Sequence, residues 1–243
     1  NLMWENMDFN GQLIEGRLIR RYKRFFADVA LPSGEIVVAH CANTGAMTGC
    51  AEPGFKVWLS RSNNPKRKLK YSWELTQNNQ NQWIGINTNR ANKLVEEALN
   101  QRTIMEVSQY SLIRREYKPN GANSRFDFLL SEPQIQSPQK CLLEVKSVTL
   151  CNGETGYFPD TVTTRGTRHC LELAQQLSIT THCVLLFCVQ HSGVKQLKIA
   201  QNIDPEYSRA LNHARSGGVT VIAYQCYLND KKIYINQQLP IVF

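Results

Sequence analysis

The spacing of apolar residues changes once along this chain, close to residue 88. Before that point the chain consists of short β-prone runs separated by turn signals. After it, the run from Ala91 to Ala98 places apolar residues at the three- and four-residue spacing of an amphipathic helix. A strand-only segment followed by alternating helices and strands predicts two domains, which we place at residues 1–88 and 89–243.

The first domain is predicted to be a small barrel. Strand-like runs recur at short intervals between Gly11 and Asn87, with turn residues between them, and one of them is the β-branched run Ile36-Val37-Val38. About five or six short strands in this length favour an OB-like barrel, the commonest small barrel that binds polyanions.

The second domain is predicted to be a mixed sheet flanked by helices, which makes the whole chain α/β (α+β). Strands are expected at Arg125–Leu130, Cys141–Val148, Val184–Val189 and Val219–Tyr224. One helix is expected after Asn87-Thr88-Asn89. A second is expected at about Thr164–Leu177, with Leu171, Ala174 and Leu177 on its buried side. A third is expected at Asp204–Arg215, where Asp-Pro begins the helix and Gly217-Gly218 ends it.

The chain carries 28 Lys and Arg against 20 Asp and Glu, a net charge of +8 that favours a polyanionic partner. Up to Arg90 the chain has 12 basic and 7 acidic residues, a surplus of five, against a surplus of three in the rest. The residues predicted to contact DNA phosphates are Arg17, Arg20, Arg21, Lys23, Arg24, Arg61, Lys66, Arg67 and Lys68. The aromatic residues among them, Tyr22, Phe25, Trp58, Tyr71 and Trp73, suit either base stacking or the barrel core. Solvated charged faces are the alternative for the basic runs.

Glu144-Val145-Lys146 is the sharpest chemical feature of the second domain. Residues two apart in a strand face the same side, so Glu144 and Lys146 project together. A second lone acid, Asp127, lies in an apolar strand earlier in the chain. Burying such charges is costly unless they pair or hold a metal. Two alternatives follow: a structural ion pair with Lys146, or a Mg²⁺ site at Asp127 and Glu144 where Lys146 orients a water.

Other kinds of site are absent from the sequence. It has no phosphate-binding loop motif, no nucleophile-elbow motif and no H-E-x-x-H motif. The eight cysteines form no zinc-ligand pattern, and several lie in apolar runs, which suits a compartment that keeps thiols reduced. The first ten residues lack the features of a signal peptide, and no segment approaches the ~18 apolar residues of a membrane span. We expect a cytoplasmic protein without a membrane partner.

The order Asp127 and then Glu144-Val145-Lys146 resembles the PD-(D/E)xK restriction-endonuclease-like superfamily. The whole chain resembles the bacterial sugar fermentation stimulation protein A family. The segments that carry this resemblance are Gly16–Phe25, Asn43–Met47, Asn64–Leu69, Asn92–Leu99, Arg125–Phe128, Glu144–Lys146, Phe158–Asp160, and Thr164–Gly166 with His169. They span nearly the full length, in the family's order.

The resemblance implies an OB-like domain, a nuclease-like domain, non-specific DNA binding and a regulatory role in sugar (maltose) metabolism. It assigns Asp127, Glu144 and Lys146 to the superfamily motif, with an acid on the preceding helix, Glu97 or else Glu96, as a further site residue. The chain departs from the family's usual residues at Ser147, where Asn is common, and at Ala46, where Ser is common. Neither change removes a metal ligand, although Ser147 borders the site.

Three functions remain open from the sequence. The first is a DNA-binding regulator with a nuclease-like metal site, and the second is an active Mg²⁺- or Mn²⁺-dependent nuclease. The third is a metabolic enzyme with an anionic small substrate. Near the site, Arg165 and His169 share a helix face and either approach a phosphate or form a surface pair. Asp160 is either a further acid of the site or part of a turn.

Overall fold

The N-terminal part of the chain closes into a barrel. The computed structural model describes residues 7–9, 11–134 and 139–243. The strands of the barrel are β2 (Ile14–Tyr22), β3 (Phe26–Ala30), β4 (Ile36–His40), β5 (Lys56–Arg61), β6 (Tyr71–Gln77) and β7 (Trp83–Gly85). Their order is β4-β3-β2-β5-β6-β7. A parallel pairing of β4 with β6 closes a ring of five strands, and β7 pairs with β6 as a sixth strand outside the ring. This is the five-stranded OB topology, so the predicted barrel is confirmed.

Side-chain alternation along these strands fills the barrel. On β4, Val37 and Ala39 are buried while Ile36 and Val38 face outward. Because residues two apart face the same side of a strand, this alternation fixes an inner and an outer face. Trp73 is fully buried in the barrel core, and Trp58 is buried against the second domain. These two tryptophans therefore belong to the core.

The C-terminal part contains two sheets and three helices. The larger sheet has the order β1-β16-β15-β13-β10-β9-β8. Its strands are β1 (Met7–Asp8), β8 (Leu112–Tyr117), β9 (Phe126–Ser131), β10 (Lys140–Val148), β13 (Thr181–Val189), β15 (Thr220–Leu228) and β16 (Lys232–Leu239). The smaller sheet contains β11 (Leu150–Asn152), β12 (Thr155–Phe158), β14 (Gln196–Ile199) and β17 (Ile241–Val242). The helices are α1 (Arg90–Asn100), α2 (Thr164–Gln176) and α3 (Pro205–Ser216), with a short 3₁₀ turn at Met105–Val107.

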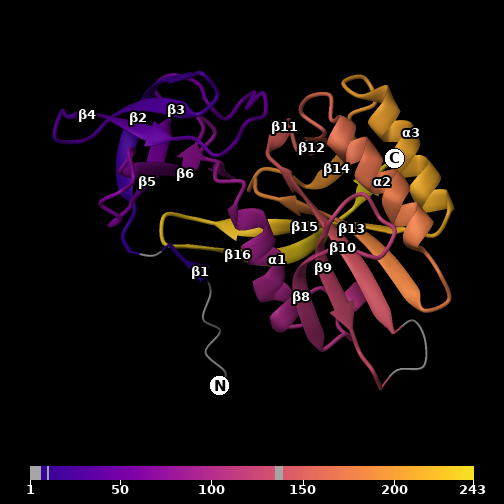
Figure 1. Ribbon diagram of the computed structural model, residues 1–243. Coiled ribbons are helices and arrows are strands. Elements are labelled where there is room, and N and C mark those ends of the chain that lie inside the picture. The colour runs from indigo at the N-terminus through magenta and orange to yellow at the C-terminus, as the bar shows by residue number, and fades with distance from the viewer. Residues whose placement is uncertain (1–6, 10, 135–138) are drawn as a thin grey trace.

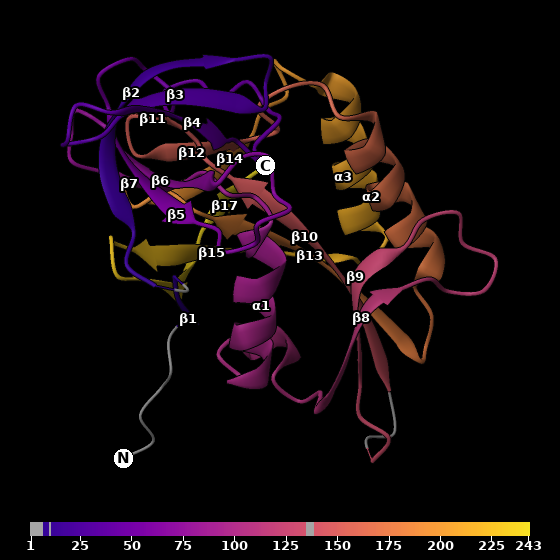
Figure 2. The same cartoon turned by 60° about the vertical axis from the view of Figure 1, so that its left-hand side comes forward.

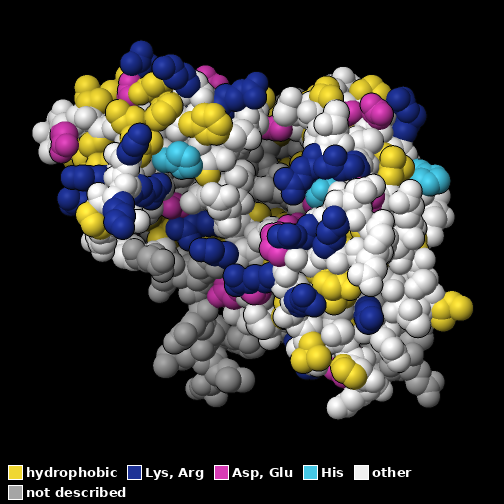
Figure 3. Space-filling model, viewed as in Figure 1, with side chains coloured by type: hydrophobic (Ala, Val, Ile, Leu, Met, Phe, Trp, Pro, Cys, Tyr) yellow, Lys and Arg dark blue, Asp and Glu magenta, His cyan; other side chains and the backbone are white. Residues whose placement is uncertain are grey.

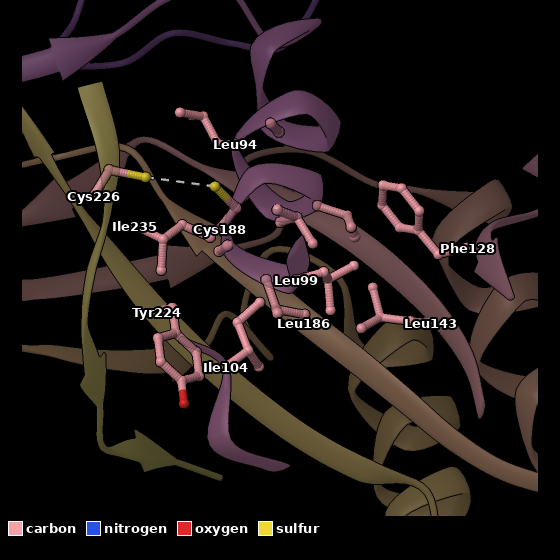
Figure 4. Packing of buried hydrophobic residues seen from close by; sticks show 14 of the residues in the cluster. Leu94, Leu99, Ile104, Phe128, Leu143, Leu186, Cys188, Tyr224, Cys226 and Ile235 are labelled. Atoms are coloured by element: carbon pink, nitrogen blue, oxygen red, sulfur yellow. Dashed lines mark hydrogen bonds between the residues drawn. The ribbon is translucent and has the colours of Figure 1, made fainter. Parts of the chain in front are cut away.

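The larger sheet lies between helices. Figures 1 and 2 show α1 on one face and the adjacent helices α2 and α3 on the other. Leu94 and Leu99 of α1 pack with Leu143 and Leu186 of the central strands (Figure 4). The predicted mixed sheet flanked by helices is thus confirmed.

Two helix predictions have different outcomes. For α3, Asp204 accepts a hydrogen bond from the Tyr207 N–H at 2.9 Å and Gly217 caps the C-terminus, as predicted. For α2, the prediction that Leu171 is buried is wrong, because it is 40% exposed. The helix buries Cys170 and Leu173 instead, since its orientation brings His169 beneath it toward the sheet.

The barrel packs directly against the second domain. The Gly85 N–H donates to the Gln190 carbonyl at 2.8 Å, and the Trp83 N–H donates to Ser192 Oγ at 2.8 Å. In addition, β1 pairs with β16 of the larger sheet, although the sequence places it in the first domain. The domain limits 1–88 and 89–243 stay a prediction. Strand β1 belongs to the first range in sequence, but its pairing partner β16 lies in the C-terminal sheet.

The described ranges contain no helix that is both long and apolar enough to cross a membrane. The eight cysteines are free thiols, and all but Cys151 are buried. Cys188 and Cys226 lie 3.6 Å apart, sulfur to sulfur, inside the core that Figure 4 shows. The cysteines thus act mainly as small core residues.

Candidate metal centre and nucleic-acid interface

The candidate site forms where two strands separate. The antiparallel ladder between β9 and β10 runs from Ser131–Lys140 to Phe128–Leu143 and stops there. The next residues, Asp127 and Glu144, are therefore not paired with each other in the ladder. The Val145 N–H, which the ladder no longer uses, donates to Asp127 Oδ2 at 2.7 Å. The end of the ladder thus creates the space that the two acids occupy.

Asp127 is held by donors from two elements. Besides the Val145 N–H, Asn92 of α1 donates from Nδ2 to Asp127 Oδ1 at 2.7 Å. Burial and the nearby charge of Glu144 raise the pKa of Asp127 to about 6, although these hydrogen bonds oppose the rise. A buried carboxylate that still repels its neighbour benefits from a cation between the two.

Glu144 is buried and paired through one of its oxygens. Lys146 Nζ donates to Glu144 Oε1 at 2.6 Å, and His169 Nδ1 contacts the same oxygen. Burial acts to raise the pKa of Glu144, but the His169 hydrogen bond and the Lys146 charge outweigh it and lower the pKa. The neighbouring Arg165 Nε lies 3.4 Å from His169 Nε2. Since an arginine nitrogen can only donate, His169 accepts at Nε2 and donates from Nδ1 to Glu144.

The second oxygen of Glu144 points to an additional ligand. Within the described part of the chain, Glu144 Oε2 is buried and has no hydrogen-bond partner. Two carboxylates with one buried, unpaired oxygen suit a hard divalent cation, which also takes water and substrate oxygens. The described residues contain no cluster of three or more His, Cys, Asp or Glu arranged as metal ligands. A cation here would therefore need further oxygens from water or phosphate.

Helix α1 contributes an amide to the site. Asn92 of α1 donates a hydrogen bond to Asp127. Glu96, one helical turn after Asn92, instead forms an ion pair with Arg115 of β8. Sequence reasoning missed Asn92 because an amide among helical polar residues carries no charge signal. The sequence signal that could have identified Asn92 is its place in Asn92–Leu99, one of the segments that carry the family resemblance. The role of Glu97 stays a prediction.

The predicted basic residues divide into two groups. Lys23, Arg24, Lys66 and Lys68 are exposed in the loops β2–β3 (residues 23–25) and β5–β6 (residues 62–70). Arg61 is exposed at the end of β5. Four others have protein partners: Arg17 bonds the Gly54 carbonyl, Arg20 pairs with Asp28 at 2.7 Å, Arg21 bonds the Arg24, Asn43 and Gly45 carbonyls, and Arg67 bonds Ser72 Oγ. Arg21 in particular is half-buried and organises loops.

Two adjoining pockets lie between Asp127 and the barrel. A pocket of about 220 Å³ beside Asp127 is lined by Asn89, Asn92, Lys93, Arg115, Glu116 and Phe128. A second pocket, of about 410 Å³, is lined by Arg61, Arg67 and Arg90 and shares Asn89 and Lys93 with the first. In Figure 3, Lys and Arg side chains lie along the hollow between the two domains. The pockets thus form one basic groove that runs from the barrel to Asp127.

The remaining predicted site residues have structural contacts. Asp160 Oδ2 accepts a hydrogen bond from the Ala46 N–H at 3.1 Å, so this acid ties the two domains together. Because the donor is the backbone N–H of Ala46, the contact does not require the serine side chain that is common at this position in the family. Ser147 Oγ accepts from Gln190 Nε2 at 2.9 Å. His169 is buried against Glu144, so of the two predicted alternatives the exposed surface pair is wrong for this residue.

Fold and site together define a class of protein: an OB barrel joined to a restriction-endonuclease-like domain with paired acids and a lysine. Residues 19–86 match the family model of the SfsA N-terminal OB domain, and residues 89–232 match that of the sugar fermentation stimulation protein RE domain. The chain belongs to the sugar fermentation stimulation protein family, and the resemblance found in its sequence is confirmed.

Relatives match over almost the entire chain. A sugar fermentation stimulation protein homolog of Pseudoalteromonas atlantica is 54% identical over 97% of this chain and 100% of its own length. The homolog of Alteromonas mediterranea is 50% identical over the same shares. The structure of Pyrococcus furiosus SfsA in complex with Ca²⁺ has a TM-score of 0.85 and 23% identity, and covers 98% of each chain. The likeness to this last structure shows the fold.

Proposed function

We propose that this protein binds nucleic acid along the groove between its domains, with a divalent cation at Asp127 and Glu144. The observation that carries the proposal is the shared wall of the two pockets at Asn89 and Lys93. Through it, a strand bound at Arg61 and Arg67 would reach Asp127 without leaving the groove. OB barrels bind oligonucleotides through the corresponding loops and sheet face.

Mg²⁺ or Mn²⁺ fits this donor set, because both take few carboxylates together with water and phosphate oxygens. The Ca²⁺ bound by the related Pyrococcus furiosus protein supports a divalent site in the family fold. Phosphate contacts carry no base information, so the proposed binding is tolerant of sequence. In the cell this activity would serve the regulation of sugar metabolism in the cytoplasm, where free thiols are stable.

The proposal predicts that DNA binding falls steeply with salt. Each phosphate contact contributes about 0.7 to 0.9 to the slope of log K against log salt. We expect the combined substitution of Lys23, Arg24, Lys66 and Lys68 by Ala to reduce the magnitude of this slope by about three, because each of the four side chains accounts for one phosphate contact. The measurement is fluorescence anisotropy of labelled DNA over a salt series.

The matched control replaces Lys195 and Lys198, basic residues outside the groove, by Ala. It should leave both affinity and slope unchanged. Binding by the wild type that is indifferent to salt, or a slope that the loop substitutions do not alter, would show that the barrel loops are not the DNA surface.

A second candidate function is metal-dependent cleavage. It is favoured by Lys146, whose ammonium lies 2.6 Å from Glu144 Oε1 beside the position of the cation. A bound divalent cation supplies Lewis acidity and lowers the pKa of a water. Lys146 would stabilise charge that develops on the phosphate, and Asp127 and Glu144 would hold the cation. Products from labelled DNA with Mg²⁺ or Mn²⁺, lost with EDTA and in Lys146→Ala, would establish this activity.

A further inference from the structure

A row of aromatic rings crosses the outer face of the barrel. Tyr22 of β2 is the register partner of Phe26 on β3, and Phe26 is the partner of His40 on β4. The neighbours Ala27 and Ala39 are fully buried, so Phe26 and His40, one position away along their strands, face outward. All three rings of the row are partly exposed.

Two of these rings already form a platform. Tyr22 and Phe26 stack with their centroids 5.5 Å apart and their planes 20° from parallel. The guanidinium of Arg20 lies 4.9 Å from the Tyr22 centroid and is fixed by its ion pair with Asp28. Phe25, in the adjoining loop, is 47% exposed. Three strands span about 10 Å across the sheet, a width on which such sheet aromatics stack about two or three bases.

The row adjoins the basic groove. His40 is the third ring of the row and also lines the pocket that contains Arg61 and Arg67. Lys23 and Arg24 follow Tyr22 directly and are exposed. Hydrophobic side chains are interspersed with Lys and Arg on the barrel surface in Figure 3. Rings that can stack on bases thus lie between two sets of cations that can bind phosphates.

We infer that the nucleic acid this protein prefers is single-stranded, with bases stacked on Tyr22, Phe26 and His40 at the start of the groove. A duplex keeps the faces of its bases covered by their neighbours, whereas a single strand exposes them. The inference rests on the proposed function, because it specifies which nucleic acid enters the groove. Stacking tolerates any base, which agrees with sequence-tolerant binding.

The test compares an oligothymidine of about 16 nucleotides, the upper site size of an OB domain, with a duplex of equal length by fluorescence anisotropy. Phe26→Leu keeps the apolar volume and removes the ring. We expect it to weaken single-strand binding about tenfold and to leave duplex binding within about twofold of the wild type. Phe26→Trp keeps a ring and should restore single-strand binding.

The chain offers a matched control in its second domain. Tyr227 and Tyr234 form another stacked cross-strand pair, 5.1 Å apart, with Lys232 over both rings. Tyr227→Leu should leave binding of both probes unchanged. Equal affinity of the wild type for both probes, or full single-strand affinity in Phe26→Leu, would overturn the inference while DNA binding itself stands. Failure of the wild type to bind either probe would instead overturn the proposed function.

Discussion

Addition of Mg²⁺ or Mn²⁺ is expected to raise the thermal midpoint of this protein by about 5 to 10 °C. A cation that binds the folded state alone stabilises it by about 2.7 kcal/mol at 100 times its Kd, and each kcal/mol shifts the midpoint of a chain of this size by about 2–4 °C. Relief of the repulsion between Asp127 and Glu144 is one source of this binding free energy. Differential scanning fluorimetry over a cation series measures the rise.

Glu144→Gln should abolish this rise, because it removes a ligand charge and retains the shape of the side chain. The control Glu154→Gln changes an exposed glutamate, 73% accessible, and should keep the full rise. Protons compete with the cation for Asp127, whose pKa is about 6 without metal, so the rise should shrink as the pH falls through that value. An undiminished rise in Glu144→Gln would place the cation elsewhere.

In metal-free buffer, Lys146→Met is expected to destabilise the protein by about 3–5 kcal/mol, the usual cost of removing one partner from a buried ion pair. The side chains of Lys146 and Glu144 are only 12% and 4% exposed, so water cannot replace the lost ammonium. The charge of Lys146 also lowers the pKa of Asp127, so both acids lose a compensating cation. Urea denaturation in EDTA measures the loss.

The double variant Lys146→Met with Glu144→Gln should be less destabilised than Lys146→Met alone, because the buried charge of Glu144 is removed together with its ion partner. Lys195→Met breaks an ion pair with Glu154 whose partners are 65% and 73% exposed, and should cost under about 1 kcal/mol. A loss in Lys146→Met as small as in this control would show that the Lys146 pair does not stabilise the site.

Much of the fold follows from local sequence patterns. Three patterns predict elements that the structure contains. They are the change of apolar spacing near residue 88, the alternation on β4 and the apolar run of β13. These patterns report which face of an element is buried, and burial decides most of the architecture. Leu171 is an exception: apolar spacing marked it as buried, but the buried face of α2 carries His169, Cys170 and Leu173 instead.

The site was less predictable, for a physical reason. Asp127, Glu144 and Lys146 stand out because charges in apolar strands are costly. Asn92 and His169 hold these charges in place, yet each comes from a helix distant in sequence, and only tertiary packing brings it to the acids. The same holds for the row of Tyr22, Phe26 and His40, which exists only once three strands are in register.

Calorimetric titration of Mn²⁺, with and without bound oligothymidine, tests the central claim most directly. If phosphates in the groove complete the coordination of a cation at Asp127 and Glu144, oligothymidine should tighten Mn²⁺ binding about tenfold, and Mn²⁺ should tighten oligothymidine binding by the same factor. Asp127→Asn should remove the coupling. Equal Mn²⁺ affinity in both titrations would contradict the account, because the metal site and the nucleic-acid groove would then be independent.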